Sequence, residues 1–359
     1  MSSSPGRFLS AIMQTLTGGH RPVPPHKQQG YDEGSWEHMS LNGLVTKAQS
    51  GFFWVATDQG EYVCRIRGRL TKKRSHSDLV AVGDRVTIDI VDEEKREGAV
   101  QSVAPRERVL SRARPAANSR DFLQDREQVL VANPDQVVLI LSIREPETSL
   151  RKLDRFLVVA EANDIPAVLC INKIDLVAEG VAQKEFALYE KLGYPVFYTS
   201  AQTGAGIAEL RAQLKDKLTV FAGSSGVGKS TLLNAIQPGL QLRTSAVSEA
   251  TSKGMHTTRH VELIPLAGGG YVADTPGVRA LALFDMEPEE LDAYFREIAP
   301  LVEHCRFSDC THRQEIGCAV RAAVKAGDVD PGRYESYLRL WEEHEALVKA
   351  TYGKQRETG

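Results

Sequence analysis

Apolar and polar residues alternate with a period of two between about residues 41 and 112, which is the pattern of half-buried β-strands. One such strand places Val86, Ile88 and Ile90 on a single face. Two further segments are separated by residues 58–60, Asp-Gln-Gly, a sequence typical of a hairpin turn. Four or five short strands with almost no helix between them predict a small β-barrel of the OB type, a fold that often binds nucleic acid.

Strands and helices alternate in the next segment, from about residue 113 to residue 284. Residues 136–143, "QVVLILSI", form a continuous apolar run, which is typical of a strand buried on both faces. Gly193 follows a helical segment at the position where a glycine commonly ends a helix. The alternation predicts a doubly wound α/β domain with a mainly parallel sheet. Further strands are expected at residues 166–172, 195–200 and 218–223, and helices at 152–164, 182–193 and 206–216.

Helices are expected to dominate after residue 284. The last of them should begin after Asp330, whose side chain can cap it, with Pro331 in the first helical position. An apolar stripe along this helix predicts that it packs on the rest of the protein. The stripe consists of Tyr334, Tyr337, Leu338, Trp341 and Val348.

The composition excludes several classes of protein. Charged residues make up 25% and apolar residues 42% of the chain, as in ordinary globular proteins, and no apolar run is long enough to cross a membrane. Residues 1–36 lack the apolar core and cleavage site of a secretory signal, and we expect them to form a mobile extension. These features predict a cytoplasmic protein without membrane association.

Basic residues are concentrated in two stretches, although the net charge of −3 argues against a uniformly basic surface. Residues 65–74 contain six basic residues and no acid, and residues 106–114 contain four arginines and one glutamate. Such patches can bind a phosphate backbone, or they can form a solvated basic face. The residues predicted to contact RNA are Arg65, Arg67, Arg69, Lys72, Lys73 and Arg74.

Residues 223–230 match the phosphate-binding loop G-x-x-x-x-G-K-[ST] and lie between a predicted strand and a predicted helix. The backbone N–H groups of such a loop, together with the helix N-terminus, surround phosphate oxygens. We expect Lys229 to reach the β- and γ-phosphates and to assist catalysis, and Ser230 to offer its hydroxyl to Mg²⁺. The alternative is a glycine-rich turn that holds no ligand.

A second motif, Asn172-Lys-Ile-Asp175, indicates guanine. Asp175 can accept hydrogen bonds from N1–H and the N2 amine of guanine, which adenine cannot supply, and such a mismatch costs on the order of 1–3 kcal/mol. Asn172 can bond the opposite side of the base, and the stem of Lys173 can lie along its plane. Residues 199–201, Thr-Ser-Ala, follow the next strand, where the Ala201 N–H could donate to guanine O6.

A third motif, Asp-Thr-Pro-Gly at residues 274–277, follows a short strand. Asp274 would hold Mg²⁺ through water, and the Gly277 N–H would meet the γ-phosphate. Either Thr257 or Thr258 could complete the magnesium shell, and we favour Thr258. The predicted magnesium ligands are therefore Ser230, Thr258 and Asp274. The predicted nucleotide contacts are Asn172, Lys173, Ile174, Asp175, Ser200, Ala201, Gly223, Ser224, Ser225, Gly226, Val227, Gly228, Lys229, Ser230, Thr231 and Gly277.

The residue after this third motif departs from the common pattern. Many GTPases have a glutamine there to orient the attacking water, whereas this chain has Val278. Intrinsic hydrolysis should then be slow, or another residue must act. His256 is the nearest candidate in the sequence, and its alternative is a solvated loop histidine.

Three of the five cysteines lie within fourteen residues, which indicates a metal before disulfides in a reducing compartment. The spacing is Cys305-x4-Cys310-x-His312-x5-Cys318, and three thiolates with one imidazole complete a tetrahedral, structural zinc site. His304 is the main rival to His312. The alternative is three buried free cysteines and a surface histidine.

In this order, the motifs resemble the RsgA (YjeQ) family of circularly permuted GTPases. Apart from the nucleotide motifs, the resemblance includes "GMHTTRH", "DTPGVR", "FSDCTHRQEIGCAV" and "RYESYLRL", and it covers nearly the whole chain beyond the N-terminal extension. It implies a multidomain fold: an OB-type β-barrel, a circularly permuted α/β P-loop GTPase domain and a C-terminal helical zinc-binding domain. The domains are predicted at residues 37–112, 113–284 and 285–359.

The family resemblance also implies a function. It implies hydrolysis of GTP to GDP with Mg²⁺, docking on the small (30S) ribosomal subunit and its 16S rRNA, and hydrolysis that the subunit stimulates. It implies that His256 takes the place of the missing glutamine, and that Cys305, Cys310, His312 and Cys318 hold one structural zinc ion. We expect a monomer that acts in late subunit maturation, with hydrolysis coupled to release.

Two other interpretations remain open at this stage: a non-catalytic, GTP-sensing RNA-binding scaffold, and a P-loop ATPase or kinase. The guanine motif precedes the phosphate loop along the chain, which reverses the usual order. This permutation joins the third motif directly to the zinc-bearing segment. We hypothesise that this join carries the nucleotide state to the surface that faces the ribosome.

Overall fold

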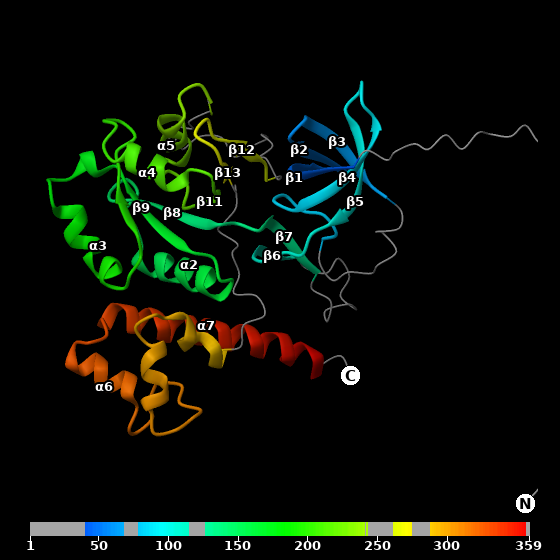
Figure 1. The fold of residues 1–359 in the computed structure, drawn as a ribbon. Helices are drawn as coiled ribbons and strands as arrows, with labels where there is room; N and C mark the ends of the chain where they lie inside the picture. Colours follow the sequence, from blue (N-terminus) through cyan, green and yellow to red (C-terminus); the bar gives the residue numbers. More distant parts are fainter. Residues whose placement is uncertain are drawn as a thin grey trace, which may run out of the picture. The chain divides into compact units, whose positions relative to one another are not determined.

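The computed structural model describes residues 40–67, 78–114, 126–240, 242, 261–274 and 288–356 (Figure 1). Its first part is a closed barrel in the strand order β1-β2-β3-β5-β4, in which β3 and β5 are parallel and the other neighbours antiparallel. This confirms the predicted barrel of the OB type. The strands are β1 (Ser40–Gln49), β2 (Phe52–Thr57), β3 (Gly60–Ile66), β4 (Arg85–Asp92) and β5 (Glu97–Val103).

The alternating pattern fills the barrel as predicted. Val86 and Ile88 of β4 are buried, and Ile90 is partly buried against the same core. Tyr62 of β3 and Val100 of β5 meet them there with no exposed surface. Because neighbouring residues of a strand point to opposite faces, the intervening positions are left for the outer surface of the barrel.

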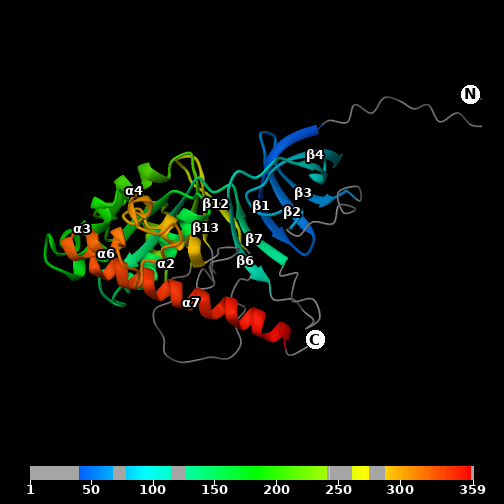
Figure 2. The same ribbon diagram turned by 90° about the horizontal axis from the view of Figure 1, so that it is seen from below.

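A separate pair of strands, β6 (Val109–Arg114) and β7 (Arg126–Ala132), follows the barrel (Figure 2). Leu110 of β6 and Val131 of β7 are buried in the same apolar cluster as residues of the α/β sheet. The domain boundary placed between residues 112 and 113 lies inside β6. It stays a prediction.

The α/β domain contains a sheet in the order β10-β9-β8-β11-β13-β12. Its first five strands are parallel and β12 is antiparallel to β13, which confirms a doubly wound, mainly parallel sheet. Every residue of β8 is buried, as its continuous apolar run predicts. The strands are β8 (Gln136–Ser142), β9 (Ala167–Asn172), β10 (Val196–Tyr198), β11 (Leu218–Ala222), β12 (Leu263–Pro265) and β13 (Tyr271–Asp274).

Helices cover both faces of this sheet (Figure 1). Leu139 and Leu141 of β8 pack with α2 (Leu150–Ala162) and α3 (Val181–Lys191) on one face. Val138 and Ile140 of β8 pack with α4 (Ile207–Leu214) and α5 (Lys229–Ile236) on the other face. The φ angle of Gly193 is 80°, and the N–H of the following Tyr194 donates to Tyr189 O at 3.1 Å, which ends α3 as predicted.

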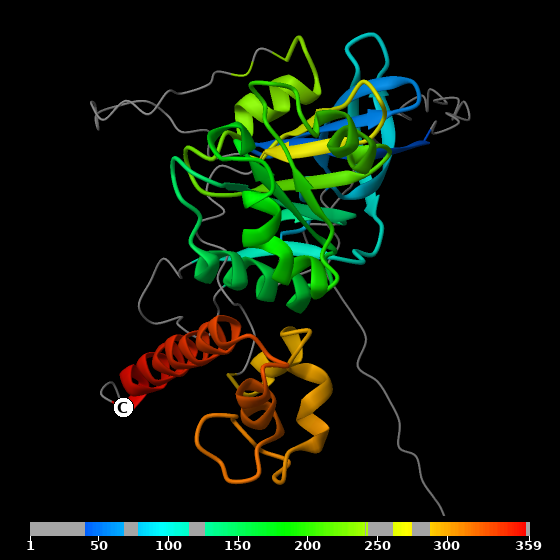
Figure 3. The same cartoon turned by 90° about the vertical axis from the view of Figure 1, so that its left-hand side faces the viewer.

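The C-terminal part, here called the helical module (residues 288–356), begins with two 3₁₀ helices, η3 (Pro288–Tyr294) and η4 (Ala299–His304), and continues with α6 (Ala319–Ala326) and α7 (Pro331–Arg356). Figure 3 shows the long α7 in red beside the orange elements. Asp330 caps α7 as predicted, because its Oδ1 accepts from the N–H groups of Gly332 (2.8 Å) and Arg333 (3.1 Å). Of the predicted stripe, Tyr337 and Trp341 are buried, and Tyr334 and Leu338 are partly buried. The side chain of Val348 lies outside the described part.

In the described ranges, no helix combines the length and apolar character needed to cross a bilayer.

Candidate functional site: a nucleotide edge and a metal cluster

The nucleotide motifs lie at one edge of the sheet although their order along the chain is reversed. Residues 172–175 start at the last residue of β9, residues 199–201 follow β10, and residues 223–230 follow β11. These strands are parallel, so their carboxyl ends reach the same edge, which is where ligands bind in such sheets. Asp274 ends the neighbouring β13.

The loop at residues 223–230 has glycines where a side chain would not fit. A Cβ on Gly223 would lie 2.3 Å from Ile140 O of β8, and one on Gly228 would lie 2.6 Å from Asn172 Nδ2. Gly228 also has a φ of 95°, which favours glycine. The Lys229 amino group donates to Gly223 O (2.8 Å) and Ser224 O (3.0 Å). The loop therefore folds tightly at the start of α5, as a phosphate cradle requires.

Asn172 connects this loop to residues 199–201; residues 172–175 and 199–201 are the two predicted base-recognition segments. Its side chain is buried; Nδ2 donates to Val227 O at 3.0 Å, and Oδ1 lies 3.3 Å from both the Ala201 N–H nitrogen and Thr199 Oγ1, which donate to it. In this structure Asn172 holds the loops together, and the Ala201 N–H is directed at Asn172. Bonds from Asn172 and Ala201 to a base stay predictions.

Asp175 lies on a short 3₁₀ helix, η1 (Ile174–Leu176), and its side chain is exposed at the sheet edge. The hydroxyl of buried Ser200 donates to Asp175 Oδ1, and this hydroxyl also accepts from the Thr203 N–H at 3.1 Å. Ser200 therefore fixes the orientation of the carboxylate. Lys173, the residue before η1, has a φ of 63°, and its Nζ donates a hydrogen bond to Glu145 O.

Several predicted site residues lie outside the described residues. They are Arg69, Lys72, Lys73, Arg74, His256, Thr257, Thr258, Gly277 and Val278. Of Asp274, only the backbone is described.

The outer face of the barrel pairs cations with aromatic rings. The Arg65 guanidinium lies 4.4 Å from the centre of the Phe52 ring, and Lys47 Nζ lies 5.2 Å from that of Trp54. Arg67 differs from Arg65, because its Nη1 lies 2.7 Å from Oδ2 of buried Asp89. Within the described part, the Asp89 oxygens have no hydrogen bond, so this ion pair compensates their charge.

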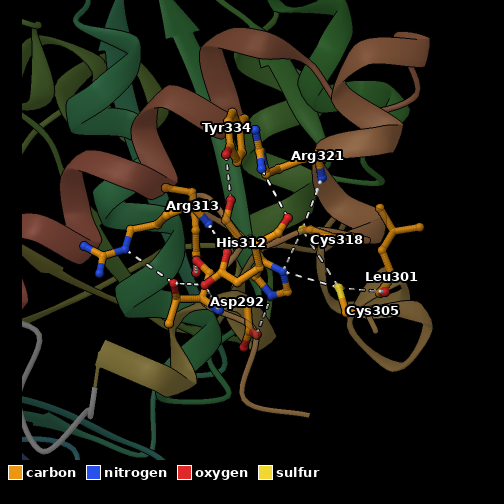
Figure 4. Close-up of polar contacts among 11 residues, drawn as sticks. Asp292, Leu301, Cys305, His312, Arg313, Cys318, Arg321 and Tyr334 are labelled. Atoms are coloured by element: carbon orange, nitrogen blue, oxygen red, sulfur yellow. Dashed lines mark hydrogen bonds and ion pairs between the residues drawn. The ribbon is translucent and has the colours of Figure 1, made fainter. Parts of the chain in front are cut away.

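The helical module brings together the four predicted metal ligands, and Figure 4 labels three of them, Cys305, His312 and Cys318. The ligand atoms of Cys305, Cys310, His312 and Cys318 all lie within 4.8 Å of one another. His312 Nδ1 is 3.5 Å from Cys305 Sγ and 3.4 Å from Cys318 Sγ. Three thiols and one imidazole at this spacing fit a tetrahedral zinc ion. The side chain of the rival His304 is 65% exposed and lies beside Glu303.

Asp292 lies beside the histidine of this cluster and is not among the residues predicted from the sequence. Its Oδ2 lies 3.0 Å from His312 Nε2, the ring nitrogen that faces away from the thiols (Figure 4). A carboxylate in this position fixes the orientation and tautomer of a metal-binding histidine. Asp292 lies twenty residues before His312 on η3, in an acidic stretch without any metal-binding spacing.

Glu315 holds the loop between the ligands. It accepts from the backbone N–H groups of Thr311 (3.0 Å), Arg313 (2.9 Å) and Gln314 (2.9 Å). Burial acts to raise the pKa of Glu315, but hydrogen bonds from the Thr311 hydroxyl and from backbone N–H groups, including those of Thr311 and Gln314, lower it to about 2.

The other two cysteines lie away from this cluster. Burial raises the pKa of the Cys64 thiol to about 11 and that of the Cys170 thiol to about 12.

Two family models match the sequence over the regions just described. The model of "RsgA GTPase" matches residues 103–284, and that of "RsgA N-terminal domain" matches residues 42–100. The chain belongs to the RsgA GTPase family. It is therefore a GTPase, and it works with GTP, GDP and Mg²⁺ as this family does.

Similar proteins support this assignment over most of the chain. An RsgA protein of Gemmatimonas aurantiaca is 45% identical over 306 residues, which is 85% of this chain and 97% of the relative. One from Bacteroides fragilis is 41% identical over 87% of this chain and 100% of its own. Both are named "Small ribosomal subunit biogenesis GTPase RsgA".

Two solved structures of the family have the same fold. YjeQ from Thermotoga maritima is 38% identical, with a TM-score of 0.68 over 85% of this chain and 98% of that one. YloQ, described as a circularly permuted GTPase, is 35% identical, with a TM-score of 0.67 over 87% of this chain and 98% of that one. The reversed order of motifs in this RsgA chain is thus a circular permutation.

Proposed function

We propose that this chain binds the small ribosomal subunit, acts in its late maturation and leaves after it hydrolyses GTP. The observation that carries the proposal is the sheet edge where the loops after β9, β10 and β11 meet, bridged by Asn172. Family members at 41–45% identity are named for small-subunit biogenesis. The protein acts in the cytoplasm, as a monomer and without a membrane.

At the nucleotide edge, Asp175 accepts hydrogen bonds from guanine while Ser200 fixes its carboxylate. The loop of residues 223–231 surrounds the phosphates, and Lys229 turns from the loop carbonyls toward them. Ser230, Thr258 and Asp274 would hold Mg²⁺, which would stabilise the charge on the phosphates. His256 positions the attacking water.

On the barrel, Arg65 and Phe52 form a surface that suits 16S rRNA, because an exposed guanidinium attracts phosphates and an aromatic ring stacks on bases. Lys47 and Trp54 extend this surface. Arg67 supports the base of the basic stretch through Asp89, while Arg69, Lys72, Lys73 and Arg74 contact the RNA.

Turnover of GTP with and without purified small subunits tests the proposal. We expect slow turnover alone and a large stimulation by the subunit, which falls steeply as salt is raised because phosphate contacts release counterions. Large subunits at the same concentration are the control. Turnover that the small subunit leaves unchanged would contradict the proposal.

A second function, a GTP-sensing RNA-binding scaffold whose slow hydrolysis does not drive its release, is favoured by Val278 at the usual glutamine position. The same assay distinguishes it. A scaffold would bind the subunit more tightly with a non-hydrolysable GTP analogue than with GDP, and the subunit would not stimulate its turnover.

Asp175→Asn tests the recognition of guanine. The amide cannot accept from both guanine donors, so we expect about 10- to 100-fold weaker GTP binding, equivalent to about 1–3 kcal/mol. Xanthosine triphosphate should regain affinity, because its C2 oxygen can accept from the new amide. Asp164→Asn, at an exposed site after α2, is the matched control. A variant with unchanged GTP affinity would contradict this role of Asp175.

A further inference from the structure

Arg333 is a buried charge between the helical module and the α/β domain. It lies in the first turn of α7, and 1% of its surface is exposed. Nη1 lies 2.7 Å from Asp154 Oδ1 of α2, and Nε lies 2.6 Å from Glu297 Oε1 of the module. Nη2 adds a third contact with Glu297 Oε2 at 3.1 Å. The two carboxylates are buried, so one guanidinium compensates charges from both domains.

Asp154 extends this contact to a second helix of the α/β domain. The hydroxyl of Tyr189 on α3 donates to Asp154 Oδ1 at 2.8 Å. Burial and the neighbouring Asp154 raise the pKa of Tyr189, so its hydroxyl keeps the proton that it donates. Helix α2 leads into β9, which ends at Asn172, and α3 leads into β10, which ends just before Ser200. One carboxylate thus connects the helices that precede both base-recognition segments.

The same turns of α7 hold the loop of the metal ligands. The Tyr334 hydroxyl donates to His312 O at 2.6 Å (Figure 4). The Tyr337 hydroxyl donates to Thr311 O at 3.0 Å. Arg333 is the immediate neighbour of Tyr334 in the helix. A change in the loop around His312 therefore acts directly on the helical turn that carries Arg333.

Apolar side chains of α2 also connect the helical module to the sheet. Val158 of α2 is fully buried in the core of the helical module, in contact with a cluster that includes Phe295 and Trp341. One turn earlier on the same face of α2 lies Asp154. The module thus completes its core on α2, and the neighbouring face of α2, with Leu153 and Leu157, packs on the sheet.

We propose that Zn²⁺ binding and guanine-nucleotide binding are thermodynamically linked through Arg333. The proposal depends on the assigned guanine binding, and it makes Arg333 a positioning residue, since it lies apart from both ligands. Zinc fixes the loop of residues 305–318, this loop fixes the first turns of α7, and Arg333 fixes α2 and α3. Each ligand then stabilises the arrangement that the other requires, and linkage between two sites acts equally in both directions.

The experiment measures both affinities on the full chain. Binding of GDP is measured before and after zinc is removed with a chelator, and zinc affinity is measured by chelator competition with and without saturating GDP. In the wild type we expect the two affinities to change by the same factor, on the order of tenfold. Arg333→Met should reduce this factor to near one. Arg155→Met, which removes the exposed pair with Glu343 in the same interface, should retain it.

If Arg333→Met fails to fold, Glu297→Gln and hydrogen exchange on the wild type test the linkage instead. Glu297→Gln keeps the pair between Arg333 and Asp154, and it should lower the linkage factor. In the wild type, zinc removal should speed amide exchange in α2 and α3.

Equal GDP affinity with and without zinc in the wild type, or unchanged exchange in α2 and α3, would overturn the linkage. A full linkage factor in both Arg333→Met and Glu297→Gln would overturn the role of Arg333. A zinc-loaded wild type that binds no guanine nucleotide would overturn the proposed function as well.

Discussion

The α/β domain meets the helical module and the barrel through interfaces of different character. At the module, Arg333 is buried between Asp154 and Glu297. At the barrel, Lys47 Nζ of β1 lies 3.1 Å from Glu262 Oε2, and the two side chains are 29% and 55% exposed. A cavity of about 780 Å³ also remains between barrel and sheet, lined by residues such as Arg85 and Tyr271. Separating the first interface takes Arg333 away from Asp154, which then has no cationic partner, whereas water can replace the exposed ion pair of the second.

Because of this difference, we expect the barrel to move relative to the α/β domain more readily than the helical module does. Glu262 precedes β12, and Lys47 and Glu262 also form an isolated bridge between their backbones. Thr257 and Thr258, the two candidates for completing the magnesium shell, lie only a few residues earlier in the sequence. The barrel thus contacts the chain just after these threonines, while the module contacts the helices that precede the predicted base-recognition segments. That the direct join to the module carries the nucleotide state stays a prediction.

The strongest test of the comparison is removal of a metal ligand, Cys310→Ser. Structural zinc contributes about 10–16 kcal/mol of binding free energy in small zinc-binding peptides, so its loss should unfold much of the module. We expect bound zinc, measured by elemental analysis, to fall to near zero, and amide exchange in α6 and α7 to become fast. Barrel amides should keep their protection.

Cys64→Ser is the matched control, because Cys64 is a buried thiol in the barrel, away from the metal cluster. It should retain zinc. A Cys310→Ser protein with wild-type zinc content would refute the metal assignment. Equal loss of protection in the barrel would show that the two interfaces do not differ as described.

The next largest effect is expected from Arg333→Met. Breaking a buried ion pair by removing one partner costs about 3–5 kcal/mol, because the remaining carboxylates stay buried without compensation. The free energy of opening α7, measured by hydrogen exchange, should fall by this amount. Arg155→Met removes a pair that is 36% and 55% exposed, and should cost less than about 1 kcal/mol. Similar costs for both variants would contradict the special role of the buried network.

The sequence predicts the sheet and its nucleotide edge well because the signals there are local. Gly228 adopts the positive φ that the turn of the loop requires, and β8 is apolar at every position except its first and last. Since parallel strands must end together, the position of each motif after its strand is enough to predict a common edge. The cysteine spacing predicts the metal cluster in the same local way.

The contacts around these sites escape prediction because they join distant residues of ordinary types. Asp154 and Arg333 are 179 residues apart, and each lies in an amphipathic helix where a charge is normally solvated. Asn172 has the side chain of a base-binding residue, but its bridging bonds to Val227 and Ala201 depend on tertiary packing. The roles of His256 and Thr258 stay predictions.

Gly83→Ala tests whether the close backbone contact between Gly83 and β7 stabilises the position of the barrel more than the exposed ion pair does. Gly83 has a φ of 90°, and a Cβ there would lie 2.1 Å from Ala132 O of β7. We expect a loss of about 2–3 kcal/mol, of which about 1–2 kcal/mol is the cost of a left-handed residue with a side chain. Gly51→Ala isolates that cost, since its φ is 81° and a Cβ would meet nothing within 4 Å. Equal losses in urea unfolding would show that the close approach to Ala132 contributes nothing.

The smallest effect is expected from Lys47→Met. The ammonium of Lys47 is shared between Glu262 and the ring of Trp54, and partly exposed pairs of this kind contribute less than about 1 kcal/mol. Salt screens such a pair, so the small difference from wild type in urea unfolding should disappear at high ionic strength. Glu262→Gln keeps Lys47 over Trp54 and separates the two contacts. A loss as large as that of Arg333→Met would mean that the barrel is held as firmly as the module. A small, salt-sensitive loss would leave Lys47 available to exchange Glu262 for a phosphate.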